Sequence, residues 1–353
     1  MRIQRIRSAG ATLFFLCAAV LVFARPAAAM AGVQRGLRLC AATVIPTMFP
    51  FLVLSNLLLD GPAARWLGVL FLPYTKLLHI ESRRAPAAVL CGILGGFAAG
   101  ARAIDQLYGD GEISCGEAQR LLVCTIGSSP AFLAGSVGAA MLGSAAAGWM
   151  LFGAQLAAGL LCGLALRPRR GETAPAARTS APVSRGFSQA LADSVWAMAL
   201  LCGYITLFAF FSAVAVPAGA GALSQFWITL PLEVTSACYA AAQSASSAKL
   251  LLCGAACSLM GASVFVQVRA FTSPDISLAP LLWSRLLHLP LMLAALWGLT
   301  RLFPVSLAAS APAGGFVTAM RMPADLLCLL FVFFAILSGA NLPARWQRGK
   351  KSV

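Results

Sequence analysis

The stretch APAAVLCGILGGFAAGARAIDQLY, residues 85–108, is the part of the sequence that decides the fold. It is apolar, and it exceeds the roughly 20 residues that a helix needs to span a bilayer. Four glycines interrupt it, at positions 92, 95, 96 and 100. Short apolar segments interrupted by glycine are typical of the discontinuous helices around a transporter's binding site. The alternative interpretation is a continuous helix whose glycines only allow neighbouring helices to pack closely.

The composition of the whole chain agrees with a membrane location. Of its 353 residues, 60% are hydrophobic and 10% are charged, whereas soluble domains carry roughly 25% charged residues. The net charge of +15 arises mostly from arginines and lysines between apolar blocks, which is the positive-inside pattern. We therefore expect an all-α polytopic integral membrane protein surrounded by a lipid bilayer, with no nucleic-acid partner.

Long runs without any charged residue recur along the chain. The interval from Arg120 to Arg167 encloses 46 uncharged residues, which is enough for two passes, and the interval from Asp193 to Glu233 encloses 39. Counted in this way, the sequence predicts about eight to ten membrane segments, some of them re-entrant rather than full crossings.

The expected organisation has five parts. Residues 1–32 form an N-terminal signal-anchor helix, with a cleaved signal peptide as the alternative. Residues 33–166 and 187–303 form two repeats, and residues 167–186, rich in arginine and proline, form a basic linker between them. Residues 304–353 add a C-terminal membrane helix and a basic tail. Because Lys and Arg accumulate on the cytoplasmic side, we expect the linker and both termini to be cytoplasmic.

The two halves share short matches in the same order. These matches pair Arg35-Gly36 with Arg185-Gly186, Leu90-Cys91-Gly92 with Leu252-Cys253-Gly254, Gly100-Ala101 with Gly261-Ala262, and Arg120-Leu121-Leu122 with Arg285-Leu286-Leu287. They place residues 85–108 in the same position as residues 250–271, a second Gly-interrupted segment. The first pair falls on opposite sides of the membrane, so the prediction is two inverted repeats, a plan common in secondary transporters. The alternative is coincidence in a chain rich in alanine and leucine.

Charged residues inside apolar segments are candidate functional residues, because a charge within the bilayer costs about 2.5–3.5 kcal/mol. Arg102 directly follows the break in the first repeat, and Arg269 lies two residues beyond Gln267 in the second. With Gln106, Gln267 and the N-termini of broken helices, they are expected to bind a small organic anion, since Arg can hold a carboxylate with two parallel hydrogen bonds. The alternative is that both arginines extend to the membrane interface.

Other candidate substrate-binding residues lie at the remaining breaks. Gly100 borders the first break, and Ser128 and Ser129 precede Pro130, which removes a backbone donor. Glu233 follows a proline at the end of a long uncharged run. It is expected to pair with a buried arginine or to carry a coupling proton or sodium ion, and the alternative is that it only marks the end of a span.

The sequence carries none of the common motifs of soluble catalysis. It has no P-loop, no dinucleotide-binding glycine motif, no HExxH and no GxSxG. Its 11 cysteines lie mostly in apolar runs without a CxxC pair, and 2 histidines give little support for a zinc site. We expect no catalytic residues, no metal, no cofactor and no enzyme activity.

A set of segments in a fixed order carries a family resemblance. They are Val44-Ile45-Pro46, Phe49-Pro50-Phe51, Gly96-Phe97-Ala98-Ala99-Gly100-Ala101-Arg102, Ser128-Ser129-Pro130-Ala131-Phe132, Leu232-Glu233-Val234-Thr235, Gly261-Ala262-Ser263-Val264-Phe265-Val266-Gln267-Val268 and Arg285-Leu286-Leu287-His288. On these segments the chain resembles the sporulation integral membrane proteins of the nucleoside-recognition (Gate) family. Ala98 and Ser129 depart from the proline and the glycine that the family has at those positions.

The resemblance implies a role in sporulation. Members of that family are associated with spore cortex formation and, in the outer forespore membrane, with movement of dipicolinic acid. It therefore implies a permease that moves a small organic anion, dipicolinic acid, across a forespore membrane. The alternatives are a non-transporting membrane protein needed for assembly of the spore cortex or envelope, and a nucleoside-type transporter.

Overall fold

The computed structural model describes residues 22–46, 48–50, 52–53, 69–166, 187–305 and 307, together with residues 16, 19 and 20. Within these residues all regular structure is helical. Five helices there are long and apolar enough to cross a membrane. The prediction of an all-α polytopic membrane protein is confirmed. Most of the signal-anchor segment, the linker and nearly all of the C-terminal segment lie outside the described residues.

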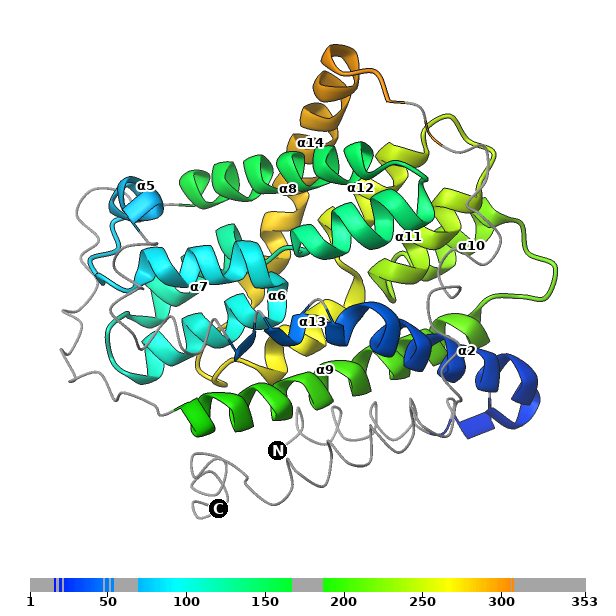
Figure 1. Ribbon diagram of the computed structural model, residues 1–353, viewed down its shortest axis with the longest axis horizontal. Coiled ribbons are helices and arrows are strands. Elements are labelled where there is room, and N and C mark those ends of the chain that lie inside the picture. Colours follow the sequence, from blue (N-terminus) through cyan, green and yellow to red (C-terminus); the bar gives the residue numbers. More distant parts are fainter. Residues whose placement is uncertain are drawn as a thin grey trace, which may run out of the picture.

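The first half contains α2 (Pro26–Leu39), η1 (Cys40–Val44), η2 (Val69–Phe71), α5 (Leu72–Leu77), α6 (Ala85–Gly109), α7 (Cys115–Thr125), η3 (Ala131–Met141) and α8 (Ala145–Ala165). The second half contains α9 (Phe187–Ala215), α10 (Ala222–Thr229), α11 (Val234–Gln243), α12 (Lys249–Leu259), α13 (Gly261–Ala270) and α14 (Ala279–Leu302). In Figure 1, α2 and α9 lie side by side along one edge of the molecule and α8 lies near the opposite edge.

The helix α6 folds into a hairpin, although its length and hydropathy are those of a membrane span. Its backbone turns at Gly96, where φ is 77° and ψ is −170°, a conformation that glycine adopts without steric cost. A Cβ atom placed on Gly92 would lie 3.0 Å from the Cα atom of Gly100. Residues eight apart in a continuous helix are about 12 Å apart along the axis, so the two arms of α6 must pack against each other.

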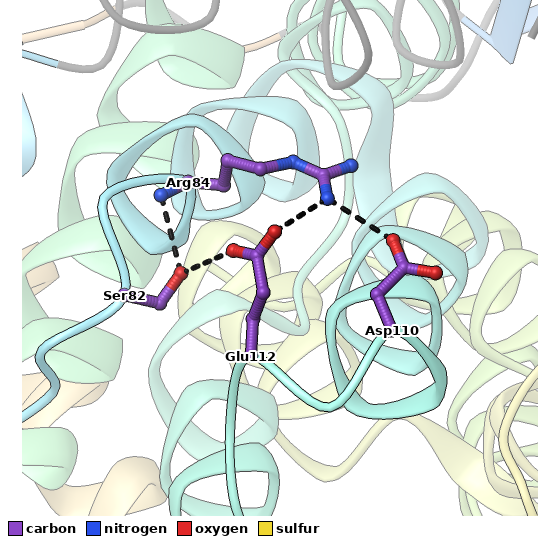
Figure 2. A network of polar contacts seen from close by, with 4 residues as sticks. All are labelled: Ser82, Arg84, Asp110 and Glu112. Carbon is purple, nitrogen blue, oxygen red and sulfur yellow. Dashed lines mark hydrogen bonds and ion pairs between the residues drawn. The ribbon is translucent and has the colours of Figure 1, made fainter. Parts of the chain in front are cut away.

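The two ends of this hairpin are joined by charged side chains (Figure 2). Arg84, which precedes α6, contacts Asp110 at 3.0 Å and Glu112 at 2.7 Å, both of which follow it. Ser82 also donates a hydrogen bond to Glu112. Burial lowers the pKa of the Arg84 guanidinium, but the hydrogen bonds and charges of Glu112 and Asp110 raise it by more, so the net shift is upward. We call Ser82, Arg84, Asp110 and Glu112 the clasp of the hairpin.

The helix that follows the hairpin is interrupted. α7 begins with a capping box between Ser114 and Glu117, a pattern that starts a helix firmly. It ends at Thr125, and the chain continues as η3 only after Pro130. A prolyl nitrogen cannot donate a hydrogen bond, which prevents α7 from continuing through this position. The predicted break at residues 127–130 is confirmed.

The second half repeats this arrangement. α10 and α11 pack side by side as a second hairpin, which turns at residues 230–233. α12 and α13 form a second interrupted helix, and its break lies at Met260 and Gly261, where φ is 67° and 69°. Positive φ is uncommon for a residue with a side chain, so Met260 holds a strained backbone at the break.

Matching elements of the two halves run antiparallel, as the inverted repeats predict. Along α2 and η1, Gly36 faces Thr206 and Cys40 faces Cys202, so the numbering rises on one helix and falls on α9. The same holds for α8 and α14, where Cys162 contacts Ser284 and Gly159 faces His288.

The register of the repeat differs from the one that the sequence matches indicated. Residues 85–108 form a hairpin, and its counterpart is the hairpin α10–α11, not residues 250–271. The latter correspond to α7 and η3, the interrupted helix of the first half. Glycine occurs at both kinds of break for the same backbone reason, so Gly-Ala matches aligned two segments that fold differently.

Candidate binding site at the interrupted helices

In each half, the turn of the hairpin meets the break of the interrupted helix. In the first half Gly96 lies against Ser129, and a Cβ atom on Gly96 would be 3.2 Å from the Ser129 nitrogen. Gln155 from α8 holds the unwound segment, accepting from the Ser128 N–H at 3.0 Å and donating to the Ser128 carbonyl at 2.9 Å. This pairing supplies the bonds that the missing helical turn would have made.

A small cavity of about 20 Å³ lies beside this first meeting point. Gly92, Thr125, Gly127, Ser128 and Gln155 are among the residues that line it. A space of this size accommodates about one water molecule. The broken segment is therefore closely packed, and a larger ligand requires it to move.

In the second half the backbone itself joins the two breaks. The N–H groups of Ala262 and Ser263, at the start of α13, donate to the carbonyls of Pro231 and Leu232 at 2.8 and 2.9 Å. Gly261 approaches Leu232 so closely that a Cβ atom would lie 3.0 Å from the Leu232 carbonyl carbon. The hairpin turn thus occupies the N-terminus of α13, which would otherwise be open.

Glu233 lies in this turn and is 4% exposed. Its carboxylate accepts hydrogen bonds from the N–H groups of Thr235 at 2.7 Å and Ser236 at 2.6 Å, so it caps α11. A negative charge at a helix N-terminus is favourable both through these bonds and through the helix dipole.

Arg285 of α14 lies between the two interrupted helices and is 2% exposed. One of its terminal nitrogens donates to the Val123 carbonyl of α7 at 3.3 Å, and the other lies 3.9 Å from the sulfur of Met260 at the second break. Ser284 and the Leu281 carbonyl, both on α14, take its remaining contacts. Among the residues that the structure describes, no carboxylate forms an ion pair with it.

His288 lies one turn further along α14 and is 1% exposed. Its Nδ1 atom is 2.7 Å from the hydroxyl oxygen of Ser258 on α12. With Arg285 and Ser284 it forms a polar group on α14, in the interior of an otherwise apolar set of helices. We call Arg285, His288, Ser258 and Ser284 the α14 polar cluster.

The predicted arginines are engaged elsewhere. Arg102 donates to the Asp193 backbone carbonyl and lies 4.0 Å from the Asp193 carboxylate on α9. Arg269, at the end of α13, donates to the carbonyls of Thr272, Ser273 and Ile276 in the following loop. These contacts of the two guanidiniums lie away from both points where a hairpin turn meets a break. Their role in binding stays a prediction.

The other predicted site residues have different surroundings. Gly100 packs against Gly92 within the hairpin. Gln106, which has polar contacts, and Gln267 are buried. The Gln267 side-chain oxygen has no hydrogen-bond partner among the described residues, which is unusual for a buried polar atom. Ser128, Ser129 and Glu233 are the predicted residues that do lie at the meeting points.

The α14 polar cluster and Gln155 were missed as site residues. Arg285 divides an apolar stretch between Asp275 and Arg301 into two short uncharged runs, so charge spacing marks it as the end of a span. The 24-residue apolar helix α14 carries two charged residues, Arg285 and Arg301, and Arg285 lies well inside it. Gln155, by contrast, is one neutral residue in a long apolar run, and no local signal distinguishes it.

The chain is similar to the sporulation integral membrane protein YlbJ of Bacillus subtilis (strain 168), with 27% identity over 235 residues. The match covers 60% of this chain and 58% of the relative, so the chain spans less than two thirds of the relative's length. No family model matches the chain, and no solved structure matches it. The likeness supports a sporulation membrane family, and the Gate resemblance stays a prediction.

Proposed function

We propose that this protein is a membrane permease of sporulation that moves a small organic anion. The observation that carries the proposal is the meeting of each hairpin turn with an interrupted helix, Gly96 with Ser129 and Gly261 with Leu232. Two such points related by inverted repeats are what alternating access requires, because each half can open while the other stays closed.

The sign of the cargo's charge follows from the buried charges. Arg285 has no carboxylate partner among the described residues, whereas the buried carboxylate of Glu233 accepts two backbone N–H hydrogen bonds at the N-terminus of α11. Arg285 therefore places a positive charge in a low-dielectric setting beside the two breaks, which favours an anion there. Glu233, or the polar groups near it, is the proposed place for a coupling proton or sodium ion.

Dipicolinic acid is the anion that we propose, and the outer forespore membrane is the proposed location. The similarity to a sporulation membrane protein supports a role at this stage of the cell's life. Dipicolinate is compact, carries two carboxylates, and must cross a forespore membrane to reach the spore. A second candidate, a non-transporting role in assembly of the cortex, rests on the same similarity.

Uptake of dipicolinate into vesicles that contain the purified protein tests the proposal. We expect uptake above that of protein-free vesicles, and no comparable uptake of a neutral nucleoside. In sporulating cells that lack the protein, dipicolinate should accumulate in the mother cell and be depleted in the spore. Normal spore dipicolinate with a defective cortex would instead favour the assembly role.

A further inference from the structure

We propose that Arg285 binds a carboxylate of the transported anion, and that the same guanidinium connects the two repeats when no anion is bound. The inference rests on the proposed function and names the residue through which binding is coupled to movement. It assigns a role to the central part of α14, which neither the predicted arginines nor the hairpin glycines occupy.

The position of Arg285 is the first argument. Its guanidinium contacts Val123 near the end of α7, in the first repeat, and Met260 at the break of α12–α13, in the second. α14 also packs on α7, α8 and α12. One buried side chain therefore joins the segments next to both breaks.

The quality of these contacts is the second argument. All of them go to neutral acceptors, at 3.0–3.3 Å for the oxygens and 3.9 Å for the Met260 sulfur. Hydrogen bonds between a guanidinium and a carboxylate are shorter, stronger and frequently paired. An anion that reached Arg285 would replace weak contacts with strong ones, so the free energy of binding is largest in the state where the present contacts are broken.

The surroundings of Arg285 are the third argument. The cavity near the first break holds about 20 Å³, which is too small for an organic dianion, and Arg285 itself is almost fully buried. Access therefore requires the end of α7 or the strained Met260 turn to move away. Because those are the segments that Arg285 holds, anion binding and the opening of the repeats become one event.

The α14 polar cluster provides a second contact point. His288 lies on α14, three residues beyond Arg285, and its Nδ1 atom is 2.7 Å from the hydroxyl oxygen of Ser258 on α12. Three residues correspond to a rise of about 4.5 Å along the helix, and this separation suits the two ends of a small dicarboxylate. Arg285 would hold one carboxylate, and the Ser258–His288 pair would contact the other.

The test compares three variants in reconstituted vesicles. Arg285→Gln should reduce the apparent affinity for dipicolinate by about 10- to 100-fold, as expected for loss of a hydrogen-bonded ion pair. Arg285→Lys keeps the positive charge but cannot form two parallel hydrogen bonds to a carboxylate. Its apparent affinity for dipicolinate should therefore lie between those of the wild type and Arg285→Gln. The matched control is Arg301→Gln on the same helix, an exposed arginine over the Trp297 ring, which should leave uptake unchanged.

Thermal stability separates binding from a structural role. Arg285→Met replaces an uncompensated charge with an apolar side chain of similar length, and such replacements of buried charges often leave a protein equally or more stable. We expect an unchanged or higher melting temperature without ligand, and loss of the increase that dipicolinate produces in the wild type. A lower melting temperature with retained ligand stabilisation would overturn the inference.

Failure of the inference about Arg285 and failure of the proposed function give different results in these experiments. If wild-type protein and Arg301→Gln both transport dipicolinate and Arg285→Gln does so equally well, the inference about Arg285 is wrong and the proposed function stands. If the wild type neither transports dipicolinate nor is stabilised by it, the proposed function is wrong for this anion, and with it the assignment of Arg285 to dipicolinate.

Discussion

Gly92 shows how one absent side chain determines the shape of a membrane hairpin. A Cβ atom there would lie 2.0 Å from the Thr125 methyl group of α7, in addition to the contact with Gly100. The first contact joins the hairpin to α7, and the second joins its two arms. The glycine therefore acts through close approach, while Gly96 acts through its backbone angles.

A substitution tests this role of Gly92. Gly92→Ala should destabilise the folded protein by about 1–3 kcal/mol, as overpacking does in a filled interior, and should lower the melting temperature in detergent. Gly153→Ala is the control, because nothing lies within 4 Å of its Cβ position on α8 and alanine favours a helix. Equal melting temperatures for the two variants would contradict the close packing of the hairpin arms.

Arginine positions could be predicted less well than glycine positions. Arg102 was expected to bind an anion because it directly follows a break, and Arg269 because it lies near Gln267 in the second repeat. In the structure Asp193 contacts Arg102 and backbone carbonyls contact Arg269, and their role in binding stays a prediction. Those partners are distant in sequence or belong to a loop without pattern. The sequence indicates that a charge is costly within the membrane, but its partner is known only from the fold.

At the scale of elements, the hairpin α6 is the part that hydropathy describes least well. A 25-residue apolar helix would be about 37 Å long if straight, and nothing in its composition separates a crossing from a re-entrant hairpin. The clasp distinguishes a hairpin from a straight helix, since the guanidinium of Arg84, before α6, lies 2.7 Å from the carboxylate of Glu112, after it. The breaks could be predicted from glycine and proline, whereas the path of the chain through them could not.

Labelling from one side of the membrane tests the hairpin. Single cysteines at Ser82 and Glu112, in a cysteine-free background, should react with a membrane-impermeant maleimide added to the same side. The reason is that the two ends of α6 lie together. Reaction from opposite sides would mean that α6 crosses the membrane. Leu161→Cys, at an exposed position within the apolar helix α8, serves as the control that should react poorly from either side if α8 spans the membrane.

For the whole molecule, the pair α2 and α9 is the main contact between the ends of the two repeats. Gly32 and Gly36 on α2 allow the backbones to approach, since a Cβ atom on Gly36 would lie 2.6 Å from the Thr206 Cα atom. Small residues at such crossings are the usual means by which membrane helices associate. The antiparallel direction of this pair is what makes the repeats inverted.

A matched pair of variants tests this interface. Gly36→Ala should separate α2 from α9 and lower the melting temperature, with a cost of about 1–3 kcal/mol. Gly203→Ala on α9 has no atom within 4 Å of its Cβ position and should have little effect. Similar effects of both substitutions would show that helix propensity, not packing between the repeats, controls stability here.

The inverted plan could be predicted from the sequence, but its register could not. Short matches such as Gly100-Ala101 with Gly261-Ala262 suggested the duplication and paired a hairpin with an interrupted helix. The two halves correspond in the order of their elements, a hairpin, an interrupted helix and a closing helix. These are α6, α7–η3 and α8 in the first half, and α10–α11, α12–α13 and α14 in the second. Two different breaks use the same residue type, so residue identity alone does not establish the correspondence.

The clasp has a consequence for how the chain enters the membrane during synthesis. A helix that crosses must carry one of its charged ends through the hydrocarbon core, whereas a hairpin keeps Arg84, Asp110 and Glu112 on the side from which it entered. α6 can therefore be inserted after its neighbours, as a wedge between assembled helices. The insertion machinery would then carry neither charged end of this segment, Arg84 or Asp110 and Glu112, across the hydrocarbon core.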